Sequence, residues 1–210
     1  MSEFVVAVDG PAGSGKSSVC KEAARRLGFG YLDTGAGYRA MAMHAKNFDL
    51  LTDAIESFDY KISLDPSNVQ VHLAGLDVSE TIRTNEIASM VSEIARDPRV
   101  REQQREDARQ RIRTCEKPGI IVEGRDITTV VAPSAQVRVL LTASDQVRLA
   151  RRGKDASEDA EVLVSRDKAD SQVAEFLIPA AGVALLDTTN LNFEESVTAL
   201  MSKIQEVMNV

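Results

Sequence analysis

The sequence has few of the residues that build several common kinds of site. It contains no tryptophan and only 4% aromatic residues, which argues against the base-stacking platforms of single-strand nucleic-acid binders. Its two cysteines, Cys20 and Cys115, are not spaced as metal ligands, and this usage is typical of a reduced, cytoplasmic protein. No run approaches the roughly 18 apolar residues of a membrane span, and the start lacks the basic region of a signal peptide.

The sequence also has fewer basic than acidic residues. The 25 lysines and arginines are outnumbered by 32 aspartates and glutamates, which gives a formal net charge of −7. This balance argues against a general polyanion or nucleic-acid binder. The basic residues are nevertheless skewed toward arginine, with 17 arginines and 8 lysines. Because the forked arginine side chain suits phosphates and carboxylates, the skew favours local cationic pockets within an acidic surface.

Short apolar runs alternate with helical patterns along most of the chain. A length of 210 residues with 43% hydrophobic content indicates one domain, or one domain with a sizeable insertion. Five runs are typical of buried parallel strands: 4–8, 31–32, 120–123, 137–142 and 183–186. Helices are predicted over 16–27, 38–46, 144–153, 161–171 and from Asn192 onward. The pattern predicts an α/β fold with helices flanking a five-stranded parallel sheet.

The middle of the chain has a different pattern. Residues 60–64 and 69–73 alternate apolar and polar side chains around an Asp-Pro-Ser-Asn turn, which predicts a hairpin. Residues 75–78 are the expected third antiparallel strand, and helices are expected over 84–95 and 98–113. An α+β insertion therefore interrupts the parallel sheet. The polar segment 153–160 is expected to form a short flexible excursion.

A phosphate-binding motif lies between the first predicted strand and the first predicted helix. Residues 10–17 read Gly-Pro-Ala-Gly-Ser-Gly-Lys-Ser and match G-x-x-x-x-G-K-[ST]. The glycines let backbone N–H groups face phosphate oxygens, the lysine reaches the β- and γ-phosphates, and the serine can bind Mg²⁺. A chance match is expected on the order of once in a hundred such chains. The predicted ATP-binding residues are Gly10, Pro11, Ala12, Gly13, Ser14, Gly15, Lys16, Ser17 and Ser18.

Further motifs follow in order along nearly the whole chain: Leu-Asp-Thr-Gly-Ala-Gly-Tyr-Arg at 32–39, Glu-Gly-Arg-Asp at 123–126 and Arg-Asp-Lys-Ala-Asp-Ser at 166–171, besides segments 77–84 and 98–101. Together with the P-loop, they resemble bacterial cytidylate (CMP) kinases of the P-loop nucleoside monophosphate kinase superfamily. The resemblance implies transfer of the γ-phosphoryl group of ATP to CMP or dCMP. It also implies a P-loop kinase core over about 1–47, 115–150 and 161–210, an NMP-binding insertion over about 48–114, and a short lid over about 151–160.

The resemblance places the acceptor nucleotide on Thr34, Arg39, Ser92, Arg101, Arg125, Asp126, Arg166 and Asp170. Arg39 and Arg125 would meet its phosphate. Asp126 would accept a hydrogen bond from the N4 amino group of cytosine, which uracil lacks. Other interpretations remain open here, because a helix with six arginines can be a solvated charged face. Arg166 and Asp170, four residues apart, can equally form a simple ion pair.

Phosphoryl transfer depends on positioning and charge neutralisation more than on a general base. The resemblance gives this role to Lys16, Arg125, Asp126, Arg148 and Arg152. The last two, with Arg151, lie on the helix that leads into the lid, although a basic helix end favoured by the helix dipole is the alternative. Mg²⁺ is the expected cofactor. Its candidate ligands are Ser17, Asp33 through water, and more weakly Glu123.

Three positions depart from the family pattern. Val173 stands where an acceptor-phosphate arginine is usual, Gly37 replaces a bulkier residue, and Thr128 takes the place of a glycine. Two alternatives therefore stay open: a related kinase for UMP, AMP or a small metabolite such as shikimate, and a nucleotide-sensing module without transfer activity. A nucleic-acid binder ranks third. Because no long exposed apolar stripe is evident, we expect a monomer.

Overall fold

A five-stranded parallel sheet runs through the computed structural model, which describes residues 4–154 and 178–208. Its strand order is β2-β6-β1-β7-β8, and every neighbouring pair is parallel. The predicted α/β class and five parallel strands are confirmed. The strands are β1 (Phe4–Asp9), β2 (Gly30–Asp33), β6 (Gly119–Gly124), β7 (Val137–Thr142) and β8 (Ala184–Asp187).

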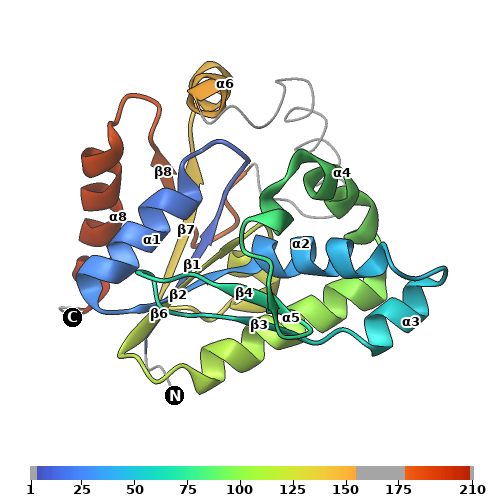
Figure 1. Cartoon of the computed structure of the whole chain (residues 1–210). Helices are drawn as coiled ribbons and strands as arrows, with labels where there is room; N and C mark the ends of the chain where they lie inside the picture. The colour runs from blue at the N-terminus through green and yellow to red at the C-terminus, as the bar shows by residue number, and fades with distance from the viewer. Residues whose placement is uncertain (1–3, 155–177, 209–210) are drawn as a thin grey trace.

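The sheet is covered on both faces, which explains its nearly continuous apolar strands. Val6 and Val8 of β1 pack on the side of α1 (Lys16–Leu27) and α8 (Phe193–Met208), which lie side by side in Figure 1. Ala7, between them, faces the opposite core, which includes side chains of α2 (Thr34–Ala45) and α5 (Pro98–Thr114). Alternate residues of one central strand thus join two cores.

The ends of two core helices show how local chemistry sets element boundaries. The first predicted helix is confirmed as α1, and Gly28 closes it in the left-handed conformation, with φ of 68°, as glycine commonly does. Helix α2 begins four residues earlier than predicted. Asp33 caps it, because its Oδ1 accepts a hydrogen bond from Ala36 N at 3.1 Å. The glycines at 35 and 37 obscured this start in the sequence, since glycine disfavours helix interiors.

The insertion, in the chain between α2 and β6, combines the expected small antiparallel sheet with three helices, of which two were expected. Its strands are β3 (Tyr60–Ile62), β4 (Val71–Leu73) and β5 (Leu76–Asp77), and its helices are α3 (Leu51–Glu56), α4 (Asn85–Ile94) and α5, with a 3-10 turn η1 (Thr81–Arg83). The short helix α3 was not predicted. The hairpin adjoins the core sheet, because Tyr31 N of β2 donates to Leu64 O at 2.9 Å.

Gly37 is one of the departures from the family pattern, and its surroundings explain it. A Cβ atom at this position would lie 2.4 Å from Gln104 Oε1 and 2.8 Å from Tyr60 Oη. Tyr60 is itself fixed by donating to Asp107 Oδ2 at 2.6 Å. Side chains of the insertion therefore fill the space that a larger residue would occupy on α2.

A short turn follows β6, and a helix follows β7. A π-helical turn, η2 (Ile127–Val131), comes directly after the 123–126 motif and was not predicted. Helix α6 (Asp145–Lys154) confirms the prediction for 144–153. The expected excursion beyond 154 and the helix predicted over 161–171 lie outside the described residues. Within the described ranges, no helix is long and apolar enough to cross a bilayer.

Two reciprocal hydrogen bonds cap the start of α8. Asn192 Oδ1 accepts from Glu195 N at 3.0 Å, and Asn192 N donates to Glu195 Oε2 at 2.8 Å, so the two residues satisfy each other's orphan groups. Replacing the cap in Asn192→Ala is expected to lower the free energy of unfolding by about 1 kcal/mol, measured by urea denaturation. The exposed Asn190→Ala variant is the control, and an equal loss in both variants would contradict the capping role.

Candidate active site

A cavity of about 760 Å³ lies where the P-loop meets the carboxyl ends of the strands. Parallel α/β sheets bind ligands at this edge, where the chain connections diverge on either side of a central strand, here β1. The lining combines core residues with residues of the insertion. It includes 11–19, Asp33, Thr34, Gly35, Tyr38, Arg39, Arg83, Ala88, Val91, Ala95, Arg101, 123–126, Arg151, 191–193 and Ser196.

The P-loop takes a conformation that requires glycine. Gly13 and Gly15 have φ of 75° and 87°, and a Cβ atom at Gly13 would lie 2.8 Å from the carbonyl oxygen of Arg148. The hydroxyl of Ser14 is buried and has no hydrogen-bond partner within the described residues. A phosphate in the loop would supply an acceptor for such a donor, so the loop fits an anionic ligand.

A buried ion pair connects the P-loop to β6. Lys16 Nζ bonds to Glu123 Oε2, and Tyr31 Oη donates to Glu123 Oε1 at 2.9 Å. Burial alone would raise the pKa of Glu123, but the Lys16 charge and hydrogen bonds from Lys16, Ser17 and Tyr31 outweigh it and hold the pKa below its usual range. Glu123 is therefore an anion that orients Lys16 at the cavity wall.

Oxygen donors for a hard cation gather beside this pair. Ser17 is exposed at the start of α1, and the carboxylates of Asp33 and Glu123 border the same cavity. Burial, followed by the neighbouring Glu123 charge, raises the pKa of Asp33, while the charges of Arg39, Arg83 and Lys16 act in the opposite direction. This all-oxygen set fits Mg²⁺, which favours a few carboxylates, substrate phosphates and water.

Asp9, at the end of β1, fixes the segment that follows the 123–126 motif. Its carboxylate accepts from Ile127 N at 2.8 Å, Thr128 N at 2.9 Å and Thr128 Oγ1 at 2.6 Å. Burial raises the pKa of Asp9 even though these donors favour its charged form. The site assignment from sequence missed Asp9. Thr128 is the second departure from the family pattern, and its hydroxyl adds a contact that glycine cannot make.

The arginines of α5 divide into two groups. Arg101 Nη2 donates to Asp126 Oδ2 at 3.1 Å, and Arg105 donates to the same oxygen from Nε at 3.1 Å and Nη2 at 2.7 Å. Arg105 was absent from the predicted site, although its four-residue spacing from Arg101 could have indicated it. The remaining arginines form ion pairs elsewhere: Arg99 with Asp97, Arg109 with Glu102 and Glu106, Arg111 with Asp107, and Arg113 with Glu106.

Other predicted acceptor residues differ in how close they come to the cavity. Thr34 and Arg39 line it, and Thr34 Oγ1 also donates to Glu123 O at 2.7 Å. Arg125 lines it too and bonds to Gly10 O of the P-loop. Ser92 is half-buried on α4 and does not belong to the lining. Arg166, Asp170, Val173 and the side chain of Arg152 lie outside the described part of the chain.

Comparison with protein families matches residues 6–206 to the model described as "Cytidylate kinase". The chain belongs to the cytidylate kinase family. Relatives named cytidylate kinase come from Desulfitobacterium hafniense (42% identical, covering 94% of this chain and 90% of the relative), Rhodococcus opacus (40%; 98% and 96%) and Cutibacterium acnes (38%; 97% and 96%). These alignments span 213 to 222 positions, more than the 210 residues of this chain, so each relative has residues that this chain lacks.

Solved structures of distant sequence share the fold. An uncharacterized protein from Eubacterium ventriosum has a TM-score of 0.54 at 11% identity, covering 97% of this chain and 99% of that one. A Thermus thermophilus protein has a TM-score of 0.51 at 16% identity, with coverage of 95% and 96%. At these identities the likeness concerns the fold alone.

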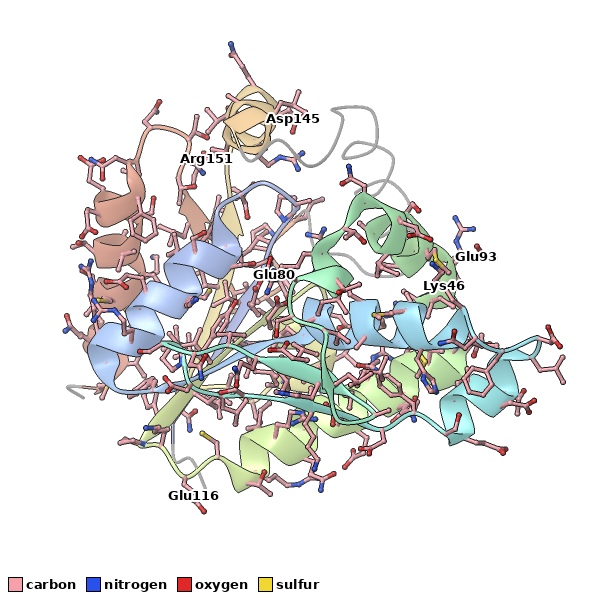
Figure 2. The ribbon with its side chains drawn as sticks, in the orientation of Figure 1. Lys46, Glu80, Glu93, Glu116, Asp145 and Arg151 are labelled. Atoms are coloured by element: carbon pink, nitrogen blue, oxygen red, sulfur yellow. The ribbon has the colours of Figure 1, made fainter. Side chains whose placement is uncertain are left out.

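Arg151, on the helix that leads into the predicted lid, contacts two segments of the core. In Figure 2 it lies between α6 and the segment leading into α8. Its guanidinium donates to Ser14 O (2.9 Å), Thr188 Oγ1 (3.0 Å), Thr188 O (2.8 Å) and Leu191 O (3.2 Å). Arg151 therefore ties the P-loop to the β8–α8 connection. Neighbouring Arg148 donates to Ala12 O at 2.8 Å and Asp145 Oδ1 at 2.7 Å.

Removing this arginine contact should weaken ATP binding. In Arg151→Met the three carbonyls each lose an N–H donor, and the P-loop loses its contact with this side chain, so we expect the dissociation constant for ATP to rise roughly tenfold. Arg151→Lys should fall between this variant and the unmodified protein, because one ammonium replaces a fork of donors. Isothermal titration calorimetry measures the effect. The exposed Lys21→Met variant controls for loss of one positive charge, and equal affinities of Arg151→Met and this control would refute the anchoring role.

Proposed function

We propose that the protein transfers the γ-phosphoryl group of ATP to CMP and dCMP, giving ADP and CDP or dCDP. The observation that carries this proposal is that a P-loop and the Arg101, Arg125 and Asp126 side chains border one cavity. Membership of the cytidylate kinase family supports the same substrates. The alternatives, which are a kinase for another acceptor and a sensing module without transfer, have no comparable support.

The donor side of the proposed reaction uses the P-loop. Backbone N–H groups of residues 10–18 would hold the phosphates at the positive end of α1, and Lys16 would meet the β- and γ-phosphates. Because Glu123 holds Lys16 by an ion pair, the ammonium would already border the cavity when ATP binds. Ser17, with Asp33 through water and Glu123 more weakly, would hold Mg²⁺, which neutralises charge on the phosphates when bound.

The acceptor side uses the opposite wall. Arg125 and Arg39 would bind the phosphate of CMP, with Thr34 beside them. Asp126 would accept from the cytosine N4 amino group, while uracil would present a carbonyl oxygen that the carboxylate repels. Ser92, Arg101, Arg166 and Asp170 complete the acceptor set that the family pattern implies.

Catalysis would rest on alignment and on charge stabilisation, with no side chain required as a general base. Lys16, Arg125, Arg148 and Arg152 would surround the transferred group, and Asp126 would fix the acceptor base. A lid over about 151–160 would exclude water and so suppress hydrolysis of ATP. The division into core, insertion and lid drawn from the sequence is part of this proposal.

We also propose a monomeric, cytoplasmic enzyme that does not bind nucleic acid. The net charge of −7 opposes binding to polyanions. Size-exclusion chromatography with light scattering tests the oligomeric state, and salt-sensitive retention on RNA would contradict the last part.

Lys16 provides the test of the site. Lys16→Ala is expected to lower transfer by at least about a thousandfold while circular dichroism shows a folded protein. Because this change leaves Glu123 buried without its partner, a loss of stability of about 1–3 kcal/mol is expected as well. The double variant Lys16→Met with Glu123→Gln removes both charges and should regain stability but remain inactive. Activity near that of the unmodified protein in either variant would refute the assignment.

A panel of acceptors tests the substrate. CMP, dCMP, UMP, AMP and shikimate are each incubated with ATP and Mg²⁺, and both ADP formation and the phosphorylated product are measured. CMP and dCMP are expected to give the highest kcat/KM. Nucleotide binding without acceptor-dependent ADP formation would instead support the sensing module, and preference for another acceptor would support a related kinase.

A further inference from the structure

Two arginines share one carboxylate oxygen at the cavity wall. Asp126 Oδ2 receives three N–H donors, one from Arg101 and two from Arg105. The three side chains are well shielded, with 12%, 13% and 19% of Asp126, Arg101 and Arg105 exposed. Charge-assisted contacts of this kind in a shielded site fix a carboxylate strongly in one orientation. Among the described residues, all three donors meet Oδ2, which leaves Oδ1 to accept from a ligand.

The two arginines differ in their access to a ligand. Arg101 lines the cavity together with Asp126, whereas Arg105 does not belong to the lining. Both extend from the same face of α5, because they lie four residues apart. Arg105 therefore reaches the ligand only through Asp126. It makes two contacts to Oδ2, at 3.1 and 2.7 Å, whereas Arg101 makes one at 3.1 Å.

We propose that Arg105 is a positioning residue that sets the discrimination between cytosine and uracil by holding Asp126. This inference rests on the proposed function, in which Asp126 meets the base. Cytosine offers an amino donor at N4 and an acceptor at N3, which complement a carboxylate and an arginine. Uracil reverses both groups, so the same pair opposes it.

Arg105 makes this pairing possible when CMP is bound. If Arg101 turns from Asp126 toward the base, the carboxylate would lose one of its donors in a shielded site. Arg105 remains, so Oδ2 of Asp126 stays hydrogen-bonded and the carboxylate stays aimed at the cavity. A carboxylate that could rotate would turn its oxygens away from the O4 carbonyl of uracil, and would therefore oppose uracil less than a carboxylate held in one orientation.

Steady-state kinetics with CMP and UMP test the proposal in Arg105→Met, Arg105→Gln and Arg105→Lys. The measured quantity is the ratio of kcat/KM for CMP to that for UMP. We expect it to fall about tenfold in the first two variants, chiefly through a higher KM for CMP, with partial recovery in Arg105→Lys. The control is Arg113→Met, which removes an exposed arginine of the same helix that pairs with Glu106, and its ratio should not change.

The outcomes separate this inference from the proposed function. If the unmodified protein does not prefer CMP, the proposed function fails. If it prefers CMP but a folded Arg105→Met or Arg105→Gln variant keeps the same ratio, the role of Arg105 is refuted. If kcat/KM falls equally for both nucleotides, Arg105 has only a structural role and the proposal is also refuted. Should Arg105→Met not fold, the ratio in Arg105→Gln decides.

Discussion

The carboxylate of Glu123 is buried beneath the P-loop, and the architecture of the site follows from the need to compensate its charge. A buried carboxylate without partners is strongly unfavourable. Its partners come from α1, through Lys16, and from β2, through Tyr31. The backbone carbonyl of the same residue accepts from Thr34 at the start of α2. One residue of β6 thus holds together the elements that form the donor side of the cavity.

Several arginines of this protein bind other protein groups and are not limited to binding phosphate. Arg151 holds backbone carbonyls of the P-loop and of the β8–α8 connection, and Arg105 holds a carboxylate from behind the cavity wall. Arg39 and Arg125 line the cavity. The excess of arginine over lysine therefore reflects both ligand pockets and their supports, since a planar fork can serve several fixed acceptors at once.

Much of the fold could be predicted because its signals are local. The P-loop, the Gly28 cap and the Asn192–Glu195 cap all depend on residues adjacent in the chain. The early start of α2 was missed because Gly35 and Gly37 disfavour a helix. The turn η2 was missed because contacts to Asp9, more than a hundred residues away in the chain, stabilise it. The same limit applies to the site. Sequence motifs indicated Lys16, Arg125 and Asp126, but only the folded chain brings Arg105 to Asp126 and Arg151 to Ser14.

The insertion also affects how the core sheet meets its surroundings. Strand β2 is an edge strand of the parallel sheet, and the backbone N–H of Tyr31 on that strand donates to the carbonyl oxygen of Leu64. Edge strands with unpaired backbone N–H and C=O groups can form hydrogen bonds with a strand of another chain. The segment after β3 occupies this position at Tyr31 and so takes up one of the backbone groups with which a second chain could pair. A shortened chain without the insertion would leave this backbone donor of β2 exposed at the edge of the sheet, and we therefore expect such a core to pair with other chains more readily.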